Sequence, residues 1–152
     1  MGTKVRSDRG FSLVETMAVL LVVAVLIAIA LPSLLRQREQ AGDVETKQHV
    51  TSVAKAQLFV YTRDMAFTDT ESVITDVLVG IDVSGDTDES VHLVVGDVVS
   101  GDSAQALVYA RSTSGTWWGI RVVAIGSEAG EHRCIGDAES DMTLTACTGV
   151  AW

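Results

Sequence analysis

The stretch Arg9-Gly10-Phe11-Ser12-Leu13-Val14-Glu15 joins a short basic leader to a long apolar run. From Gly10 to Leu35 the only charged residue is Glu15. A carboxylate inside a membrane-length apolar segment is costly, by about 2.5 kcal/mol or more at the bilayer centre. An ionisable group there is a functional hypothesis by default, and the first question is which cation pairs with Glu15.

The apolar run itself is long enough to cross a membrane. Residues 10–35 would form about 39 Å of helix at about 1.5 Å per residue, and a hydrocarbon core is about 30 Å thick. Nothing after Leu31 reads as the cleavage site of a conventional secretory signal, so we expect the apolar helix to be retained. Three basic residues precede the run and two follow it closely, which is a weak bias toward a cytoplasmic N-terminus.

Charge is distributed unevenly along the rest of the chain. Residues 36–63 carry five basic side chains against three acidic ones, a net charge of +2. From Asp64 to Trp152 there are fifteen acidic side chains against three arginines, a net charge of −12. A segment this acidic repels phosphate backbones, because neutralising them needs clustered lysine and arginine. We therefore expect no direct nucleic-acid binding.

The first 35 residues resemble the class III signal of type IV pilins and related pseudopilins. A basic leader ends in Gly10, an aromatic Phe11 follows, Glu15 comes four residues later, and a continuous apolar helix completes the pattern. In that family a dedicated membrane peptidase cuts after the glycine, on the cytoplasmic side, and methylates the new N-terminal amine. The resemblance implies a cut between Gly10 and Phe11, which makes Phe11 an N-methylphenylalanine.

The resemblance also implies that Glu15 attracts the positive N-terminal amine of a neighbouring subunit as a filament assembles. An unpaired carboxylate in lipid would be protonated or costly, whereas a neighbour's ammonium offsets its charge in a dry environment. Glu15 and Phe11 are four residues apart and face the same side of one helix, so an intramolecular pair is the alternative while the subunit waits in the bilayer. An ordinary signal-anchor with a chance glutamate is the remaining alternative.

From Gln37 to about Phe67 the sequence suits an amphipathic continuation of the membrane helix. Pro32 should remove one backbone hydrogen bond and kink this helix. Gly42 is either a second weak point or a tolerated glycine, and the tolerated glycine is favoured. We expect the head's sheet to cover the apolar members of a set with three-to-four residue spacing: Val50, Val53, Ala54, Gln57, Leu58 and Tyr61.

The head beyond Asp69 has no second apolar run long enough to span a membrane. Residues 71–80 favour one or two helical turns over a strand. Residues 90–99, 104–111 and 117–125 read as strands, residues 131–135 could supply a fourth at an edge, and residues 112–116 read as a hairpin loop. The predicted fold class is α+β, a long N-terminal helix packed on a small antiparallel sheet, which matches the layout of pilin heads.

Trp117 and Trp118 are adjacent in one expected strand and must point to opposite faces of the sheet. We expect one of them to pack under the helix. The other is expected to be partly buried at the sheet edge or, alternatively, exposed, where it could meet a neighbouring subunit or a ligand.

Cys134 and Cys147 are the two cysteines of the chain. Two cysteines behind a membrane-targeting start favour one disulfide formed outside the cytoplasm, and two reduced, buried thiols are the alternative. The bridge would close a short loop, contribute about 3 kcal/mol and tie the C-terminal segment to the sheet edge.

Most other kinds of site find no support. Asp82, Asp86, Asp88 and Glu89 could supply oxygens to calcium, which takes about six to eight ligands. Their stretch lacks the order of an EF-hand, so a solvated acidic loop is favoured and calcium binding stays the alternative. The three histidines are dispersed, and no HExxH, CxxC, GxSxG or phosphate-binding glycine loop occurs. We expect no catalytic site and no enzyme activity.

These features divide the chain into four parts. We predict a cleaved basic leader at residues 1–10, a transmembrane and assembly helix at 11–35, its amphipathic continuation at 36–67, and an acidic β-sheet head with a disulfide loop at 68–152. The resemblance implies a type IV pilus subunit, held first as a single-pass protein of the cytoplasmic membrane with its head outside.

The implied partners are other pilin subunits in a homopolymer, the prepilin peptidase and methyltransferase, and an inner-membrane assembly platform. One alternative is a type II secretion pseudopilin in a periplasmic pseudopilus. The other is a membrane-anchored binding module that does not polymerise. Whether the filament serves adhesion, motility, DNA uptake or secretion stays open.

Overall fold

The computed structural model describes residues 12–85, 87, 90–96, 104–147, 149 and 152. The chain forms two compact units, whose boundary in the sequence lies between Arg38 and Glu39. One long helix, α1 (Leu13–Asp64), contributes to both units, while the sheet and the remaining elements belong to the second unit. We call this second unit, Glu39–Trp152, the head, and the part of α1 within it, residues 39–64, the stem.

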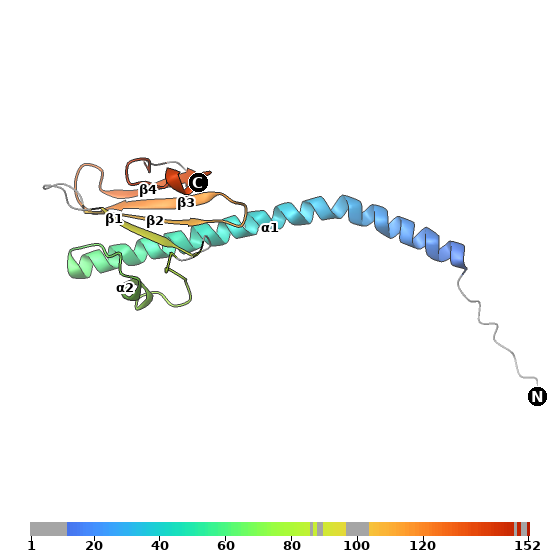
Figure 1. Cartoon of the computed structure of the whole chain (residues 1–152), viewed down its shortest axis with the longest axis horizontal. Coiled ribbons are helices and arrows are strands. Elements are labelled where there is room, and N and C mark those ends of the chain that lie inside the picture. Colours follow the sequence, from blue (N-terminus) through green and yellow to red (C-terminus); the bar gives the residue numbers. More distant parts are fainter. Residues whose placement is uncertain (1–11, 86, 88–89, 97–103, 148, 150–151) are drawn as a thin grey trace, which may run out of the picture. The chain divides into compact units, whose positions relative to one another are not determined.

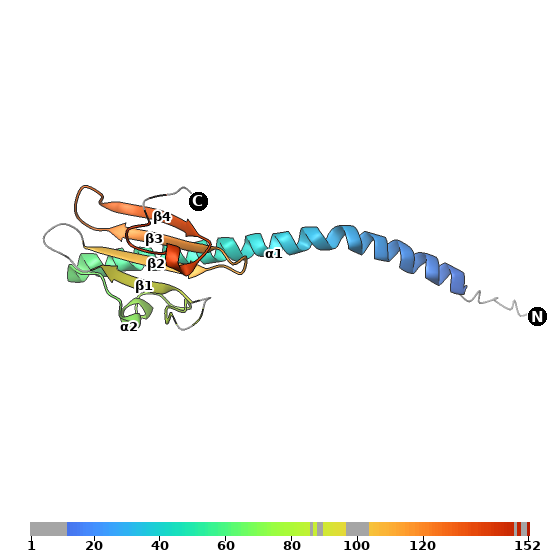
Figure 2. The ribbon, with the colours of Figure 1, turned by 45° about the horizontal axis from the view of Figure 1, so that its top comes forward.

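The head contains one antiparallel sheet of four strands. They are β1 (His92–Gly96), β2 (Gln105–Arg111), β3 (Trp117–Val123) and β4 (Gly130–Gly136), and their order in the sheet follows their order in the sequence. Figure 2 shows the strands side by side in this order. Short described loops join β2 to β3 and β3 to β4, and the predicted α+β class is confirmed. The predicted extension of β1 to Val99 lies outside the described residues.

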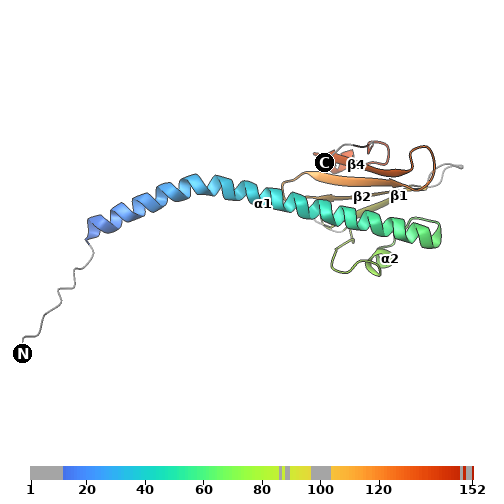
Figure 3. The same ribbon diagram turned by 180° about the vertical axis from the view of Figure 1, so that it is seen from behind.

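The stem runs along one face of this sheet, with the short helix α2 (Glu71–Thr75) beside it (Figures 1 and 3). The predicted helical turn after Thr70 is therefore confirmed, and its Ile74 is fully buried. The stem residues that point to the core recur every three to four positions, as predicted. Those that are buried are Val50, Val53, Ala54, Ala56, Gln57, Val60 and Tyr61. Leu58 of the predicted set is only half-buried, and Ala56 and Val60 join the set. Opposite them the sheet supplies Ala106, Val108, Ala110, Ile120 and Val122.

The helix ends at Asp64, three residues before the predicted end at Phe67. Met65 adopts a positive φ of 56°, and its N–H donates to the Tyr61 carbonyl at 2.8 Å. Phe67 then turns back into the core, where its ring lies 4.8 Å from that of Tyr61. A hydrophobic residue that turns back onto the last helical turn is a common way to end a helix.

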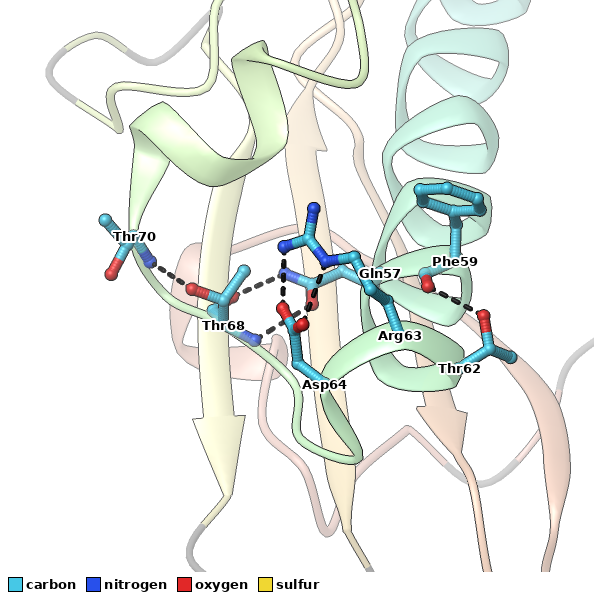
Figure 4. A network of polar contacts seen from close by, with 7 residues as sticks. All are labelled: Gln57, Phe59, Thr62, Arg63, Asp64, Thr68 and Thr70. Atoms are coloured by element: carbon cyan, nitrogen blue, oxygen red, sulfur yellow. Dashed lines mark hydrogen bonds and ion pairs between the residues drawn. The ribbon is translucent and has the colours of Figure 1, made fainter.

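A buried glutamine fixes this turn (Figure 4). The side chain of Gln57 is fully buried, so its amide needs hydrogen-bond partners within the protein. Its Nε2 donates to the Thr68 carbonyl at 2.6 Å, and its Oε1 accepts from the Thr68 N–H at 3.2 Å. One side-chain amide thus pairs with both the backbone N–H and the backbone carbonyl of Thr68, and it holds the chain that leaves α1 against the stem.

The sheet buries apolar residues on both of its faces. The face away from the stem carries Leu107, Tyr109 and Trp117, which pack against Cys134, Met142 and Cys147. Trp117 and Trp118 are 5% and 6% exposed, so the alternative of an exposed tryptophan is wrong. The reason is that the C-terminal segment after β4, including the 3-10 turn Glu139–Asp141, folds over the outer face.

The core under the stem sets the stability of the head. Ile120→Ala should lower the free energy of unfolding by about 2–5 kcal/mol, because Ile120 is fully buried between stem and sheet and its truncation leaves a cavity. Ile125→Ala is a matched control, because Ile125 is 53% exposed and should change stability by less than about 0.5 kcal/mol. Urea unfolding of the full chain in detergent micelles measures both, and equal effects would contradict the assigned core.

Candidate functional site

The apolar part of α1 exposes nearly all of its large side chains. Between Leu13 and Leu35 the least exposed of them, Val23, still exposes 43% of its surface. Within the described residues α1 is the helix that is long and apolar enough to cross a membrane. Its most apolar 18-residue window has a mean hydropathy of 3.0, and none of that window is buried. Apolar surface on this scale needs cover from lipid or from other protein.

Glu15 lies in the first turn of α1, and its side chain is exposed. A carboxylate there is favoured by the positive end of the helix dipole. Gly10 and Phe11, the predicted cleavage and methylation positions, lie outside the described residues. The pairing of Glu15 with an N-terminal amine therefore stays a prediction. The helix continues through Pro32, and the kink predicted there stays a prediction as well.

Residues 5–31 match a family described as the prokaryotic N-terminal methylation motif. The chain carries a class III prepilin signal. This signal supports membership of the chain in the type IV pilin and pseudopilin family, a family of structural proteins. Together with the apolar helix it supports membrane anchoring, and it implies processing by a prepilin peptidase and polymerisation in general terms. No curated protein matches the chain.

In the head, the start of the stem binds the loop between β2 and β3. One carboxylate oxygen of Asp43, Oδ1, accepts hydrogen bonds from the hydroxyl groups of Ser112 at 2.5 Å and Ser114 at 2.6 Å. Gly42 lies against Thr113 so closely that a Cβ at position 42 would collide with the Thr113 hydroxyl. We call these contacts of Gly42 and Asp43 with residues 112–114 the stem clamp. Gly42 therefore allows the loop of residues 112–114 to approach the stem closely. The sequence had favoured a glycine that is merely tolerated in the helix, and the structure gives it a packing role.

The stem clamp also determines the ionisation of Asp43. Partial burial alone would raise the pKa of this carboxyl group. The hydrogen bonds from Ser112 and Ser114 and the nearby Lys47 ammonium outweigh that effect, so the pKa of Asp43 lies below its ordinary value. No pattern in the sequence marks these partners, because about seventy positions separate Asp43 from the loop that it binds.

Asp43→Asn should lower the free energy of unfolding by about 2 kcal/mol at pH 7, because it weakens two hydrogen bonds to a charged acceptor. A carboxyl group with a depressed pKa stabilises the fold above its unfolded-state pKa, near 3.9, and this contribution is lost as the pH falls through the folded-state value. The difference between the wild type and Asp43→Asn should therefore shrink below about pH 4.

Urea unfolding of the full chain in detergent at pH 7 and pH 3 measures this difference. Asp69→Asn, at an exposed position outside the clamp, is the control and should have little effect at either pH. A deficit of Asp43→Asn that is the same at both pH values would contradict the role of the ionised carboxylate.

Next to the clamp, Lys47 and two tryptophans form a cation–π cluster. The Lys47 ammonium lies 3.8 Å from the centre of the Trp118 ring and 5.7 Å from that of Trp152. The Trp152 ring meets Trp118 edge-on, and the Arg133 guanidinium lies 4.8 Å from the Trp152 ring. Arg133 also donates to the Trp152 carbonyl at 3.1 Å. Lys47 thus supports the fold through its contact with the two rings.

The outer face of the sheet is covered by a disulfide. The sulfurs of Cys134, in β4, and Cys147 are bonded, and the two residues are 4% and 0% exposed. Gly119, opposite Cys134 in β3, makes room for the bridge, because a Cβ there would lie 2.7 Å from the Cys134 sulfur and 3.1 Å from the Met142 sulfur. The bridge holds the C-terminal segment over Trp117 and Tyr109.

Replacing both cysteines with alanine should lower the free energy of unfolding by about 3 kcal/mol, because the unfolded chain is then no longer constrained by the short loop. Denaturant titrations of wild type and variant, each with and without reductant, measure this difference. Reductant should lower the free energy of unfolding of the wild type and leave that of the double variant unchanged. A variant as stable as the oxidised wild type would contradict a stabilising role of the bridge.

His92 links β1 to the C-terminal segment that covers the outer face of the sheet. Its ring stacks on Tyr109 at 4.9 Å, and its Nδ1 lies 3.8 Å from a carboxylate oxygen of Glu139. The Tyr109 hydroxyl donates to the same carboxylate at 3.2 Å. Burial raises the pKa of Tyr109, and the charge of Glu139 raises it further. Within the described residues no group of three or more metal-ligating side chains comes together.

The calcium candidates fall mostly outside the described residues. Asp86, Asp88 and Glu89 are not described. Asp82 is described, and its carboxylate accepts the Ser84 N–H at 3.0 Å, a local turn contact that lowers the pKa of Asp82. Calcium binding by this stretch stays a hypothesis without a described ligand set.

Proposed function

We propose that this chain is a structural subunit of a type IV pilus-like filament and has no enzymatic role. The observation that carries the proposal is the prepilin signal at residues 5–31 on a helix whose apolar side chains are uncovered within the described chain. A membrane subunit can leave the bilayer only if other protein replaces the lipid around this surface. A polymer of such helices supplies that replacement.

The proposed maturation begins with a cut between Gly10 and Phe11, which removes the basic leader of residues 1–10. The new amine of Phe11 is then methylated and keeps its positive charge. Residues 11–35 serve as membrane anchor and later as assembly helix, residues 36–67 continue them, and residues 68–152 supply the acidic β-sheet part of the head. The head lies outside the cytoplasm, where Cys134 and Cys147 can be oxidised.

Glu15 would set the register between subunits. In a core of packed apolar helices, a carboxylate without a partner carries a large desolvation cost. The N-terminal ammonium of a neighbouring copy removes much of this cost at one relative position of the two helices. Slipped arrangements leave both charges unpaired, so the pair favours one register more than it adds attraction.

The prepilin signal alone fits both a surface pilus and the short periplasmic pseudopilus of a type II secretion system. The partners in either case are further subunits, the prepilin peptidase and an inner-membrane assembly platform. Antibody labelling of cells in the electron microscope separates the two, because a pilus carries label along surface fibres and a pseudopilus does not. A membrane-anchored binding module would form neither structure.

Glu15→Ala should abolish filaments, or reduce them at least tenfold, because no carboxylate then receives the neighbour's amine. Glu39→Ala is the matched control, since Glu39 is an exposed glutamate of the same helix outside the apolar segment, and it should assemble normally. Filaments are counted by electron microscopy, and secretion is measured in parallel. Unchanged filaments and unchanged secretion in Glu15→Ala would contradict the assembly role.

Mass spectrometry of the mature N-terminus tests the maturation step separately. The expected N-terminal peptide begins with N-methylated Phe11. A mature protein that keeps residues 1–10 would overturn the proposed processing while leaving the assembly experiment informative.

A further inference from the structure

A polar pocket lies in the head between the stem and the hairpin of β2 and β3. It has a volume of about 190 Å³, the space of about six water molecules at about 30 Å³ each. The residues that line it are Gly42, Glu45, Thr46, His49, Arg111 and Thr113. All of them belong to the head, so the pocket is formed within one compact unit of the chain.

One wall of the pocket is a single face of the stem. Glu45, Thr46 and His49 follow Gly42 by three, four and seven positions, and residues at this spacing lie on the same side of a helix. Gly42, Thr46 and His49 are half-buried, whereas Glu45 is exposed. The stem therefore presents half-buried polar groups beside a carboxylate that a dissolved ligand can reach.

The hairpin supplies the other wall. Arg111 is the last residue of β2, Thr113 lies in the loop that follows, and both are exposed. Thr113 comes close to the stem because Gly42 has no side chain, and the hydrogen bonds of the stem clamp hold the loop on both sides of Thr113. The pocket is thus already formed by contacts within the head, as small-molecule sites usually are.

The lining carries one negative and one positive side chain. The Glu45 carboxylate is an acceptor, and the Arg111 guanidinium is a planar fork of N–H donors that matches the two oxygens of a carboxylate. Arg111 also has another contact within the chain, but its five N–H donors can serve more than one group. The Thr46 hydroxyl donates to the Gly42 carbonyl at 3.0 Å, and its oxygen can still accept a hydrogen bond.

This balance of charges favours a zwitterion over a simple ion. A small anion would be repelled by Glu45 and by the residues from Asp64 to Trp152, whose net charge is −12. A small cation would be repelled by the guanidinium of Arg111. A ligand that carries a carboxylate and an ammonium group meets an opposite charge with each. The α-amino acids hold these two groups on one carbon atom, and glycine and alanine suit the volume of the pocket.

We propose that the pocket binds a free α-amino acid with a small side chain, of the size of glycine or alanine. The ligand carboxylate accepts hydrogen bonds from the Arg111 guanidinium and the Thr113 hydroxyl, and the ligand ammonium donates to Glu45. The His49 ring lies beside the ligand as part of the stem wall. This binding involves the head alone and depends neither on membrane anchoring nor on filament assembly.

The test uses the full chain in detergent micelles at constant pH 7, with its histidine rings labelled for NMR. Glycine and alanine should shift the His49 signals until saturation, whereas His92 and His132, which do not line the pocket, should keep theirs. Acetate lacks the ammonium, methylammonium lacks the carboxylate, and trimethylglycine lacks the N–H groups. Each of these three should bind at least about tenfold more weakly than glycine, because one charge-assisted contact is missing.

Two variants locate the binding. Glu45→Gln removes the charge that receives the ammonium, and Arg111→Gln removes the fork that receives the carboxylate. Each should weaken glycine binding at least about tenfold. Glu39→Gln and Arg63→Gln are the matched controls, because they remove the same charges at exposed stem positions outside the lining, and they should bind glycine like the wild type. Circular dichroism checks that each variant is folded.

The absence of a saturable His49 shift with glycine and alanine would overturn the proposal. Acetate or methylammonium binding as tightly as glycine would also overturn it, since the pocket would then hold a single ion. Undiminished glycine binding in both Glu45→Gln and Arg111→Gln would place the ligand elsewhere and have the same consequence. The ligand series on the wild type tests the pairing of both charges even where a variant fails to fold.

Discussion

The structure depends on one helix that must find cover for its apolar side chains in two different ways. In the head, the stem buries the residues from Val50 to Tyr61 against the sheet of its own chain. From Leu13 to Leu35 nothing in the described chain covers the helix. The hydrophobic effect acts on both parts alike, so the first part makes a folded domain and the second part requires a membrane or other subunits.

The elements of the head could largely be predicted from local pattern, because strand alternation, helical spacing and hairpin residues act over a few positions. The sequence located β2, β3, the loop of residues 112–116 and the edge strand β4, and it placed the core side of the stem on Val50, Val53 and Gln57. The end of α1 could not be predicted, because it depends on the contact of Gln57 with Thr68, which only the folded turn creates.

The candidate sites also differ in whether a local sequence pattern is enough to recognise them. The class III signal is a contiguous pattern of charge, glycine, aromatic residue and glutamate, so the sequence alone is enough to recognise it. The stem clamp and the pocket beside it could not be recognised in this way, since they join the stem to a loop distant in the sequence through serine and threonine hydroxyls. Nor did the alternation of β3 reveal that the C-terminal segment would bury Trp117. Long-range polar contacts leave little trace in a single sequence.

The stem clamp has a mechanical consequence. A pull along α1 enters the head at Glu39 and meets the hydrogen bonds of Asp43 first, then the Lys47–Trp118 contact and the packed residues from Val50 onward. The side chains that resist the pull are thus spaced along the helix axis, and those nearest the point of entry are polar and able to re-form. The head therefore resists a pull first through polar contacts that can re-form and only afterwards through its apolar core. A brief overload at the start of the stem can be repaired before the core begins to open.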